Sequence, residues 1–120
     1  MPERFGDALR RHRRKAGKTL RDLADLLGVS IVYISDVERG NRNPLTNDRI
    51  IRAAKSLKTD AAPLIELADR ERGFIEYDIS RASPLEAEVV GGLVSGLARG
   101  GVSDEKLRKI QRILRKDEEE

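Results

Sequence analysis

Two short helices separated by a tight turn are encoded in residues 19–38, and this pattern constrains the fold more than any other feature. Thr19 has the character of an N-cap, and Asp22 three residues later is typical of a capping box. Gly28 then ends the first helix at a position that favours a left-handed residue, and Ser30 can cap the next helix. The sequence therefore predicts a helix, a tight turn and a second helix in close succession.

Small and branched apolar residues fit a close crossing of these two helices. Ala24 is small at the point where the helix axes must approach, while Val29, Ile34 and Val37 can fix the angle between them. Two capped helices held in this way form the physical plan of a helix-turn-helix, in which the second helix lies in the major groove of duplex DNA.

Further helices are predicted on both sides of this pair. Apolar residues recur every three or four positions between residues 5 and 16 and again between residues 46 and 70, with Thr46 and Asp60 as N-caps. After Gly73 the stretch FIEYDI alternates between apolar and acidic residues, which is compatible with a short strand or an extended linker.

Two more helices are expected in the remainder of the chain. Ser83 and Pro84 can begin one helix, the pair Gly100–Gly101 breaks it, and Ser103 can cap the last helix. We therefore expect an all-α fold. A five-helix domain would occupy residues 1–73, and residues 74–120 would contain a short strand or linker and two C-terminal helices.

Charge is distributed unevenly between these two parts. Residues 1–73 contain 16 Lys+Arg and 11 Asp+Glu, a net charge of +5, whereas residues 74–120 contain 8 and 10, a net charge of −2. A basic first part is expected to meet phosphate groups. An ordinary charged surface is an equally good explanation of +5 taken alone.

Several classes of site are excluded or disfavoured by composition. The chain has no cysteine and a single histidine, His12, so we expect no disulfide, no zinc site and no other metal site. No apolar run approaches the roughly 18 residues of a membrane span, and a cytoplasmic location is expected. No catalytic or nucleotide-binding motif is present, so we expect neither an enzyme nor a cofactor.

The segments FGDALRRHRRKAG, LADLLGVS, YISDVERG and NP resemble the Cro/lambda-repressor-like (Xre-type) family of helix-turn-helix transcriptional regulators over residues 5–70. The resemblance implies a five-helix lambda-repressor-like domain that binds duplex DNA as a homodimer, usually as a repressor on a pseudo-palindromic operator. It also implies an internal ion pair between Arg13 and Glu38. The DNA-binding residues that we expect are Thr19, Ser30, Ile31, Val32, Tyr33, Asp36, Arg39 and Arg42.

The chain departs from the family pattern at some of these positions. Ile31 and Val32 have no hydrogen-bonding group and can contact only thymine methyl groups. Asp36 can accept a hydrogen bond from cytosine N4 or can repel phosphate. Leu20 stands where glutamine is common, which removes one potential phosphate contact.

The second part carries more apolar surface than a lone helix can expose to water. We expect it to form the dimer interface, or alternatively to bind a partner protein such as a toxin, as an antitoxin-like autoregulator would. A third possibility is an adaptor that uses the five helices for protein contact without DNA. The residues expected at the dimer interface are Leu85, Val89, Leu93, Leu97, Leu107, Ile110 and Leu114.

Overall fold

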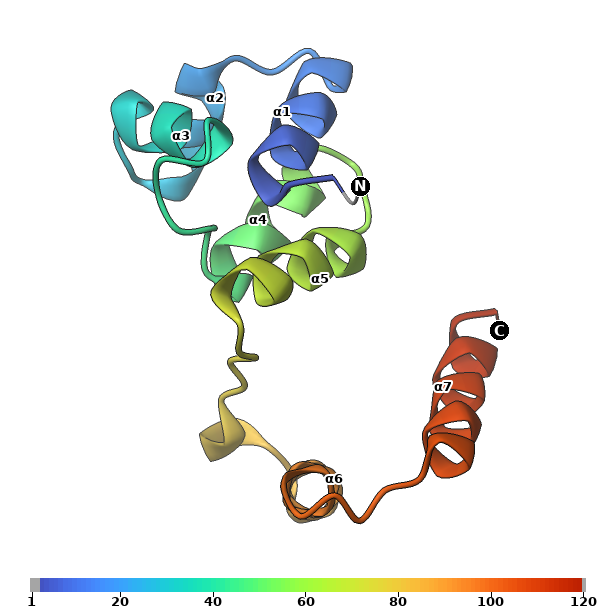
Figure 1. The fold of residues 1–120 in the computed structure, drawn as a ribbon. Helices are drawn as coiled ribbons and strands as arrows, with labels where there is room; N and C mark the ends of the chain where they lie inside the picture. The colour runs from blue at the N-terminus through green and yellow to red at the C-terminus, as the bar shows by residue number, and fades with distance from the viewer. Residues whose placement is uncertain (1–2, 120) are drawn as a thin grey trace. The chain divides into compact units, whose positions relative to one another are not determined.

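The computed structural model describes residues 3–119, with side-chain surroundings as far as residue 115. The chain divides into two compact units, Met1–Glu76 and Tyr77–Glu120. The described residues contain no β-strand, so the expectation of an all-α fold is confirmed. The first unit contains five helices (Figure 1): α1 (Phe5–Lys15), α2 (Leu20–Leu27), α3 (Ile31–Glu38), α4 (Asn47–Ser56) and α5 (Ala61–Arg72).

Side-chain caps set the starts of four of these helices. The Thr19, Ser30, Thr46 and Asp60 side chains each accept a hydrogen bond from a backbone N–H in the first turn of α2, α3, α4 and α5. These N–H groups have no partner inside their own helix, so each cap stabilises its helix by about 1 kcal/mol. The helix starts predicted from capping residues are therefore confirmed.

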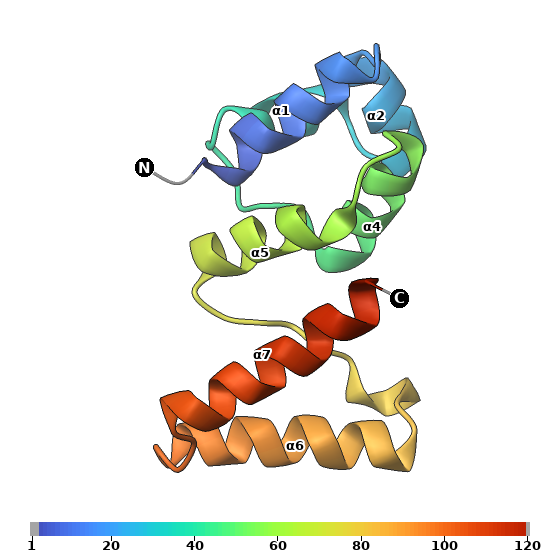
Figure 2. The same cartoon turned by 90° about the vertical axis from the view of Figure 1, so that its right-hand side faces the viewer.

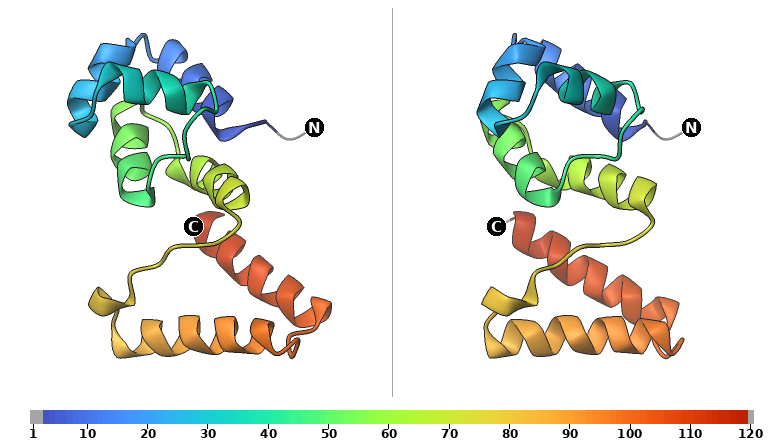
Figure 3. Two further views of the ribbon diagram at one scale, coloured as in Figure 1. Left: turned by 60° about the vertical axis from the view of Figure 1, so that its left-hand side comes forward. Right: turned by 90° about the vertical axis from the view of Figure 1, so that its left-hand side faces the viewer.

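All five helices contribute to one hydrophobic core. Figures 2 and 3 show α1 to α5 surrounding a common centre in the first unit. Burying each large apolar side chain stabilises the fold by roughly 1.5–3 kcal/mol. The packing of these side chains therefore sets how the short helices cross. The largest fully buried side chains are Phe5, Leu9, Leu23, Ile34, Val37, Leu45, Ile50 and Leu64.

The closest backbone approach in this core lies at Gly6 in α1. A Cβ atom added there would lie 2.4 Å from the carbonyl oxygen of Glu38 and 2.5 Å from that of Val37. Both distances are far shorter than a van der Waals contact, and both neighbours are backbone atoms that cannot rotate away. The end of α3 therefore rests directly on the first turn of α1.

The second unit contains a 3₁₀ turn, Ile79–Arg81, followed by α6 (Pro84–Ala98) and α7 (Asp104–Glu119). Residues 74–78 have no regular secondary structure, so the FIEYDI stretch is a linker and not a strand. The alternating pattern has no neighbouring strand in the described chain with which to form hydrogen bonds. Ser83 caps α6 by accepting a hydrogen bond from the Glu86 N–H, as its position before Pro84 predicts.

The α6–α7 hairpin closes tightly at its turn but has little interior. Gly101 N–H donates to the Gly96 carbonyl at 2.8 Å, and Val102 packs over Gly96. Among residues 77–115, Gly96 alone is buried. Figure 2 shows α7 diverging from α6 beyond this turn. Within the described residues, no helix combines the length and apolar composition needed to cross a lipid bilayer.

Candidate nucleic-acid interface

The turn between α2 and α3 is defined by caps at both ends. Thr19 Oγ1 accepts from the Asp22 N–H at 3.0 Å, and the Thr19 N–H donates to Asp22 Oδ2 at 2.9 Å. The bond from the Thr19 backbone and the contact with its hydroxyl lower the pKa of Asp22 below its ordinary value. Gly28 has a φ of +68°, as the prediction of a left-handed residue requires, and Ser30 Oγ accepts from the Tyr33 N–H at 3.0 Å.

Thr19 and Ser30 can still donate a hydrogen bond after capping their helices. Each hydroxyl oxygen accepts from a backbone N–H, but its own hydrogen stays available as a donor. Both residues are exposed, and each lies at the start of a helix, where the helix dipole favours an anion. A phosphate oxygen can therefore be bound at either position without loss of the cap.

Only part of the expected base-contacting set on α3 lies free of the core. Val32 is 68% exposed, whereas Ile31 and Tyr33 are half-buried and pack against the core, and Asp36 is half-buried. Ile34, Val37 and Glu38 are buried on the opposite side of the helix. Arg39 ends α3 and is exposed, as is Arg42 in the loop that follows.

Tyr33 and Asp36 hold two arginines beside α3. The guanidinium carbons of Arg42 and Arg49 lie 5.3 and 5.7 Å from the centre of the Tyr33 ring, within the range of cation–π attraction. Asp36 lies 4.0 Å from Arg42, and Arg49 donates to the Tyr33 hydroxyl at 3.4 Å. Asp36 therefore faces a cation. The sequence had suggested that it either accepts a hydrogen bond from cytosine or repels phosphate, and neither suggestion included this arginine.

Arg13 and Glu38 form a buried pair that joins α1 to α3. Arg13 donates from Nε and Nη2 to the two carboxylate oxygens at 2.7 and 2.9 Å, and from Nη1 to the Lys18 carbonyl at 2.9 Å. The hydrogen bonds to Glu38 raise the pKa of Arg13, while burial opposes this rise. Arg10 also donates to Glu38, at 3.4 Å, a contact that the sequence did not predict.

A model of the family described as "Helix-turn-helix domain" matches residues 4–67. The match spans α1 to α4 and the first half of α5, including both capped helices and the turn between them. The chain belongs to the helix-turn-helix domain family. The resemblance to helix-turn-helix regulators that was stated from the sequence is therefore confirmed.

One relative of this chain is the transcriptional regulator ClgR from Mycobacterium tuberculosis. It is 45% identical over 42 residues, which make up 35% of this chain and 38% of that protein. The aligned region thus spans well under half the length of this curated relative.

Two solved structures also align with about half of this chain. The clp gene regulator ClgR from C. glutamicum is 31% identical, with a TM-score of 0.46, over 56% of this chain and 86% of that chain. The restriction-modification controller protein C.AhdI from Aeromonas hydrophila is 35% identical, with a TM-score of 0.45, over 50% of this chain and 89% of that one.

The loop after α3 is tied to the rest of the helix-turn-helix domain by residues outside the motif. Arg72 at the end of α5 donates to the Leu45 carbonyl and, at 3.3 Å, to the Asn47 side chain, while Asp69 pairs with it at 3.1 Å. Leu45 is itself fully buried. The loop that carries Arg42 is therefore anchored at its far end, which local sequence patterns did not reveal.

Proposed function

We propose that this protein binds duplex DNA and regulates transcription, acting as a repressor homodimer on a pseudo-palindromic operator. The observation that carries the proposal is the outer side of α3, where Val32 is exposed and Arg39 and Arg42 follow at the helix end and in the loop. An exposed apolar side chain early in a helix that ends beside guanidinium groups suits a base-pair edge with phosphates nearby. The net positive charge of residues 1–73 also supports binding to the phosphates of DNA.

Each exposed residue then has a separate role. Val32 contacts a thymine methyl group, because it offers no hydrogen bond. Arg42 reaches a base edge or the groove wall, and the Thr19 and Ser30 hydroxyls bind phosphate together with the N-termini of α2 and α3. Asp36, which faces Arg42 at 4.0 Å, fixes the direction of that guanidinium and does not read a base itself.

The second unit supports the homodimer, because it cannot form a core alone. Leu85 in α6 is 71% exposed and Leu114 in α7 is 62% exposed. The other interface residues expected from the sequence, Val89, Leu93, Leu97, Leu107 and Ile110, are exposed or half-buried. A 44-residue unit with no fully buried apolar side chain among its described residues needs a partner surface to be stable.

A second copy of the same hairpin fits this face by charge. Residues 84–98 contain two acidic residues and no basic one, whereas residues 104–115 contain five basic and two acidic residues. In a two-fold arrangement, α6 of each copy can lie against α7 of the other, which brings opposite charges together twice. The α3 helices of two copies related in this way would reach successive major grooves, roughly 34 Å apart.

Selection of binding sites from random duplexes, followed by affinity measurements at two salt concentrations, tests the DNA-binding proposal. We expect an enriched pseudo-palindrome with half-sites about one helical turn apart and an affinity that falls steeply with salt. Val32→Asp should abolish enrichment, because it places a carboxylate against the bases, whereas Ile51→Asp, at an exposed apolar residue of α4 outside both proposed surfaces, should leave it unchanged. No enriched site together with weak salt dependence would contradict the proposal and favour a protein-binding adaptor.

The molar mass in solution tests the homodimer separately. The full chain should have the mass of a dimer, and Leu85→Glu or Leu97→Glu should convert it to a monomer, because each places a charge in the apolar face. Ile51→Glu, at an exposed apolar residue of α4, is the matched control. A full chain that remains monomeric would contradict the dimer and leave the face to a different protein, as in an antitoxin-like regulator.

A further inference from the structure

A cationic pocket lies in the first unit between the end of α1 and the turn that joins α4 to α5. None of its lining residues belongs to α3 or to the loop that carries Arg42, although Lys18 directly precedes Thr19, a proposed phosphate contact. Its volume is about 420 Å³, within the range of small-molecule sites. The lining residues are His12, Lys15, Ala16, Lys18, Ser56, Leu57, Lys58 and Thr59.

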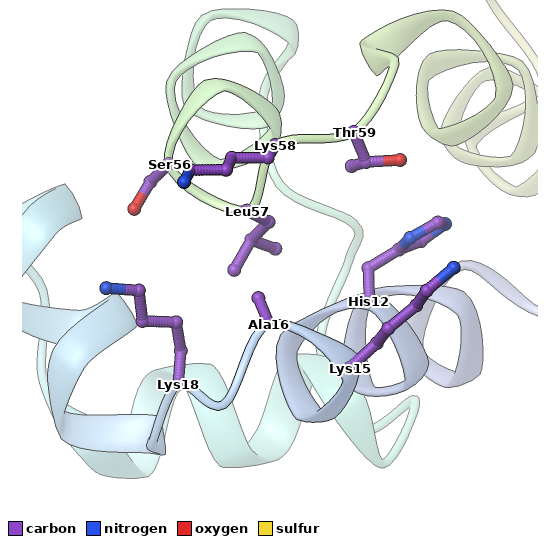
Figure 4. A pocket seen from close by; sticks show the side chains of 8 residues that line it. All are labelled: His12, Lys15, Ala16, Lys18, Ser56, Leu57, Lys58 and Thr59. Atoms are coloured by element: carbon purple, nitrogen blue, oxygen red, sulfur yellow. The ribbon is translucent and has the colours of Figure 1, made fainter.

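The lining is one-sided in charge. Three ammonium groups and one imidazole face the pocket, together with two hydroxyl groups, and no carboxylate lines it. Figure 4 shows Leu57 and Ala16 at the centre, with Ser56, Lys58 and Lys18 to one side and Thr59, His12 and Lys15 to the other. An apolar floor between two sets of polar side chains suits a small organic anion that carries a charged group at one end or at both ends.

The backbone at Lys58 is unusual. Its φ of +54° makes it the non-glycine residue with positive φ among the described residues. The Lys58 and Thr59 N–H groups close the end of α4 by donating to the Lys55 and Ala54 carbonyls, a geometry in which glycine is the preferred residue. A lysine here carries a conformational cost, and its side chain runs above Leu57 toward Ser56 (Figure 4).

The electrostatic surroundings of His12 agree with this picture. Burial lowers the pKa of His12 most, and the charges of Arg11 and Lys15 lower it further, while Glu3 opposes them. Burial and the neighbouring cations therefore disfavour the imidazolium form of His12. A bound anion would reverse this effect and raise the pKa of His12, since it would favour the imidazolium form.

From these observations we propose that the pocket is a binding site for a small phosphate-bearing anion, held by Lys15, Lys18 and Lys58 and by the hydroxyls of Ser56 and Thr59. Phosphate oxygens accept charge-assisted hydrogen bonds from ammonium groups and hydroxyls, and a multiply charged anion gains most from three cations. The apolar floor of Leu57 and Ala16 favours a free anion with a small organic body over the extended backbone of a duplex.

His12 is the single histidine of the chain, so its imidazole NMR signals report on the pocket without ambiguity. The full chain would be titrated with pyrophosphate, against sodium chloride at matched ionic strength, while the His12 signals and their pKa are followed. We expect a saturable shift and a raised pKa with pyrophosphate alone. Equal, non-saturating shifts with both salts would overturn the proposal.

Two variants and a control locate the site. Lys58→Asn removes the charge but keeps a residue that tolerates positive φ, and Lys15→Gln removes a second charge. Each should weaken pyrophosphate binding about tenfold, whereas Lys55→Gln, at an exposed lysine of α4 outside the pocket, should not. Saturable binding that is unchanged in both pocket variants would contradict the assignment.

A duplex titration separates the two possible sources of phosphate. If a random duplex, in the absence of pyrophosphate, shifts the His12 signals saturably and the shift is lost in Lys58→Asn, the pocket belongs to the DNA-binding surface and the proposal fails. We expect duplex to leave the His12 signals in place. This result does not depend on whether the protein regulates transcription, so failure of either proposal can be recognised independently.

Discussion

Asp36 of α3 and Arg42 of the following loop face each other at 4.0 Å, with the Tyr33 ring beside the same guanidinium. An acidic residue on a proposed DNA-contacting helix is unfavourable near phosphates unless a cation neutralises it. The pairing therefore gives Asp36 a positioning role and limits the directions that Arg42 can take.

Arg42→Ala is expected to weaken duplex binding roughly tenfold and to reduce the dependence of log affinity on log salt by about one unit if the guanidinium contacts a phosphate. Arg70→Ala, which removes an exposed arginine of α5, is the control and should leave both quantities unchanged. The measurement is a binding isotherm at several salt concentrations. Equal effects of the two substitutions would show that only total charge matters.

Asp36→Asn should broaden the range of duplexes bound and weaken the preferred one, because Arg42 loses the carboxylate that orients it. In an Arg42→Ala background the same substitution should have almost no further effect, since the two residues act as one unit. The affinities of the four proteins for one selected duplex give the coupling. Additive losses would mean that Asp36 contacts a base directly, and a gain in affinity would mean that it repels phosphate.

Glu38→Ala should lower the free energy of unfolding by about 3 kcal/mol, because it leaves the buried Arg13 guanidinium without its partner. Glu3→Ala removes an exposed pair with Arg11 and should change stability very little, since water screens that pair. Urea unfolding of both variants measures the difference. Similar midpoints for Glu38→Ala and the unsubstituted chain would contradict the structural role of the pair.

Lys58→Gly should stabilise the chain by about 1 kcal/mol, because glycine adopts positive φ without steric cost. Lys55→Gly, three residues earlier within α4, should destabilise it by about the same amount, because glycine lowers helix propensity. Thermal unfolding of the pair distinguishes the two backbone environments. Destabilisation by both substitutions would contradict the described conformation of Lys58.

The capping box at the start of α2 should give stability a defined dependence on pH. The pKa of Asp22 is lower in the folded chain than in the unfolded one, because the Thr19 N–H donates to its carboxylate and the Thr19 hydroxyl adds to this effect. The contribution is therefore fully present above the ordinary carboxyl pKa and is lost as the pH falls through the lowered value. Unfolding measured across acidic pH should show this loss, and Asp22→Ala should remove it.

Local sequence signals predicted the helix starts well, because a cap depends on residues within three positions of each other. Thr19, Ser30, Thr46, Asp60 and Ser83 all cap where the sequence indicates. The same reasoning left the 74–79 stretch open between strand and linker. Alternation describes which side chains share a face, but a strand also needs a neighbour for its backbone hydrogen bonds.

Contacts made by long side chains could not be predicted in the same way. The approach of Arg49 to Tyr33 joins α4 to α3, and that of Arg72 to Leu45 joins α5 to the loop. Both depend on how helices cross, which short-range patterns do not encode. The family resemblance implied that Ile31 meets bases, whereas in the structure it is half-buried and packs against the core.

Gly6 contacts no proposed ligand, yet it sets the distance between α1 and α3. Any side chain at this position would push the end of α3 outward, and the N-terminal half of the same rigid helix, which carries Val32, would tilt with it. Reading of a DNA sequence by this chain would then depend on a hydrogen atom on the far side of the helix from the bases. Gly6→Ala should accordingly alter which duplexes are preferred even where the domain still folds.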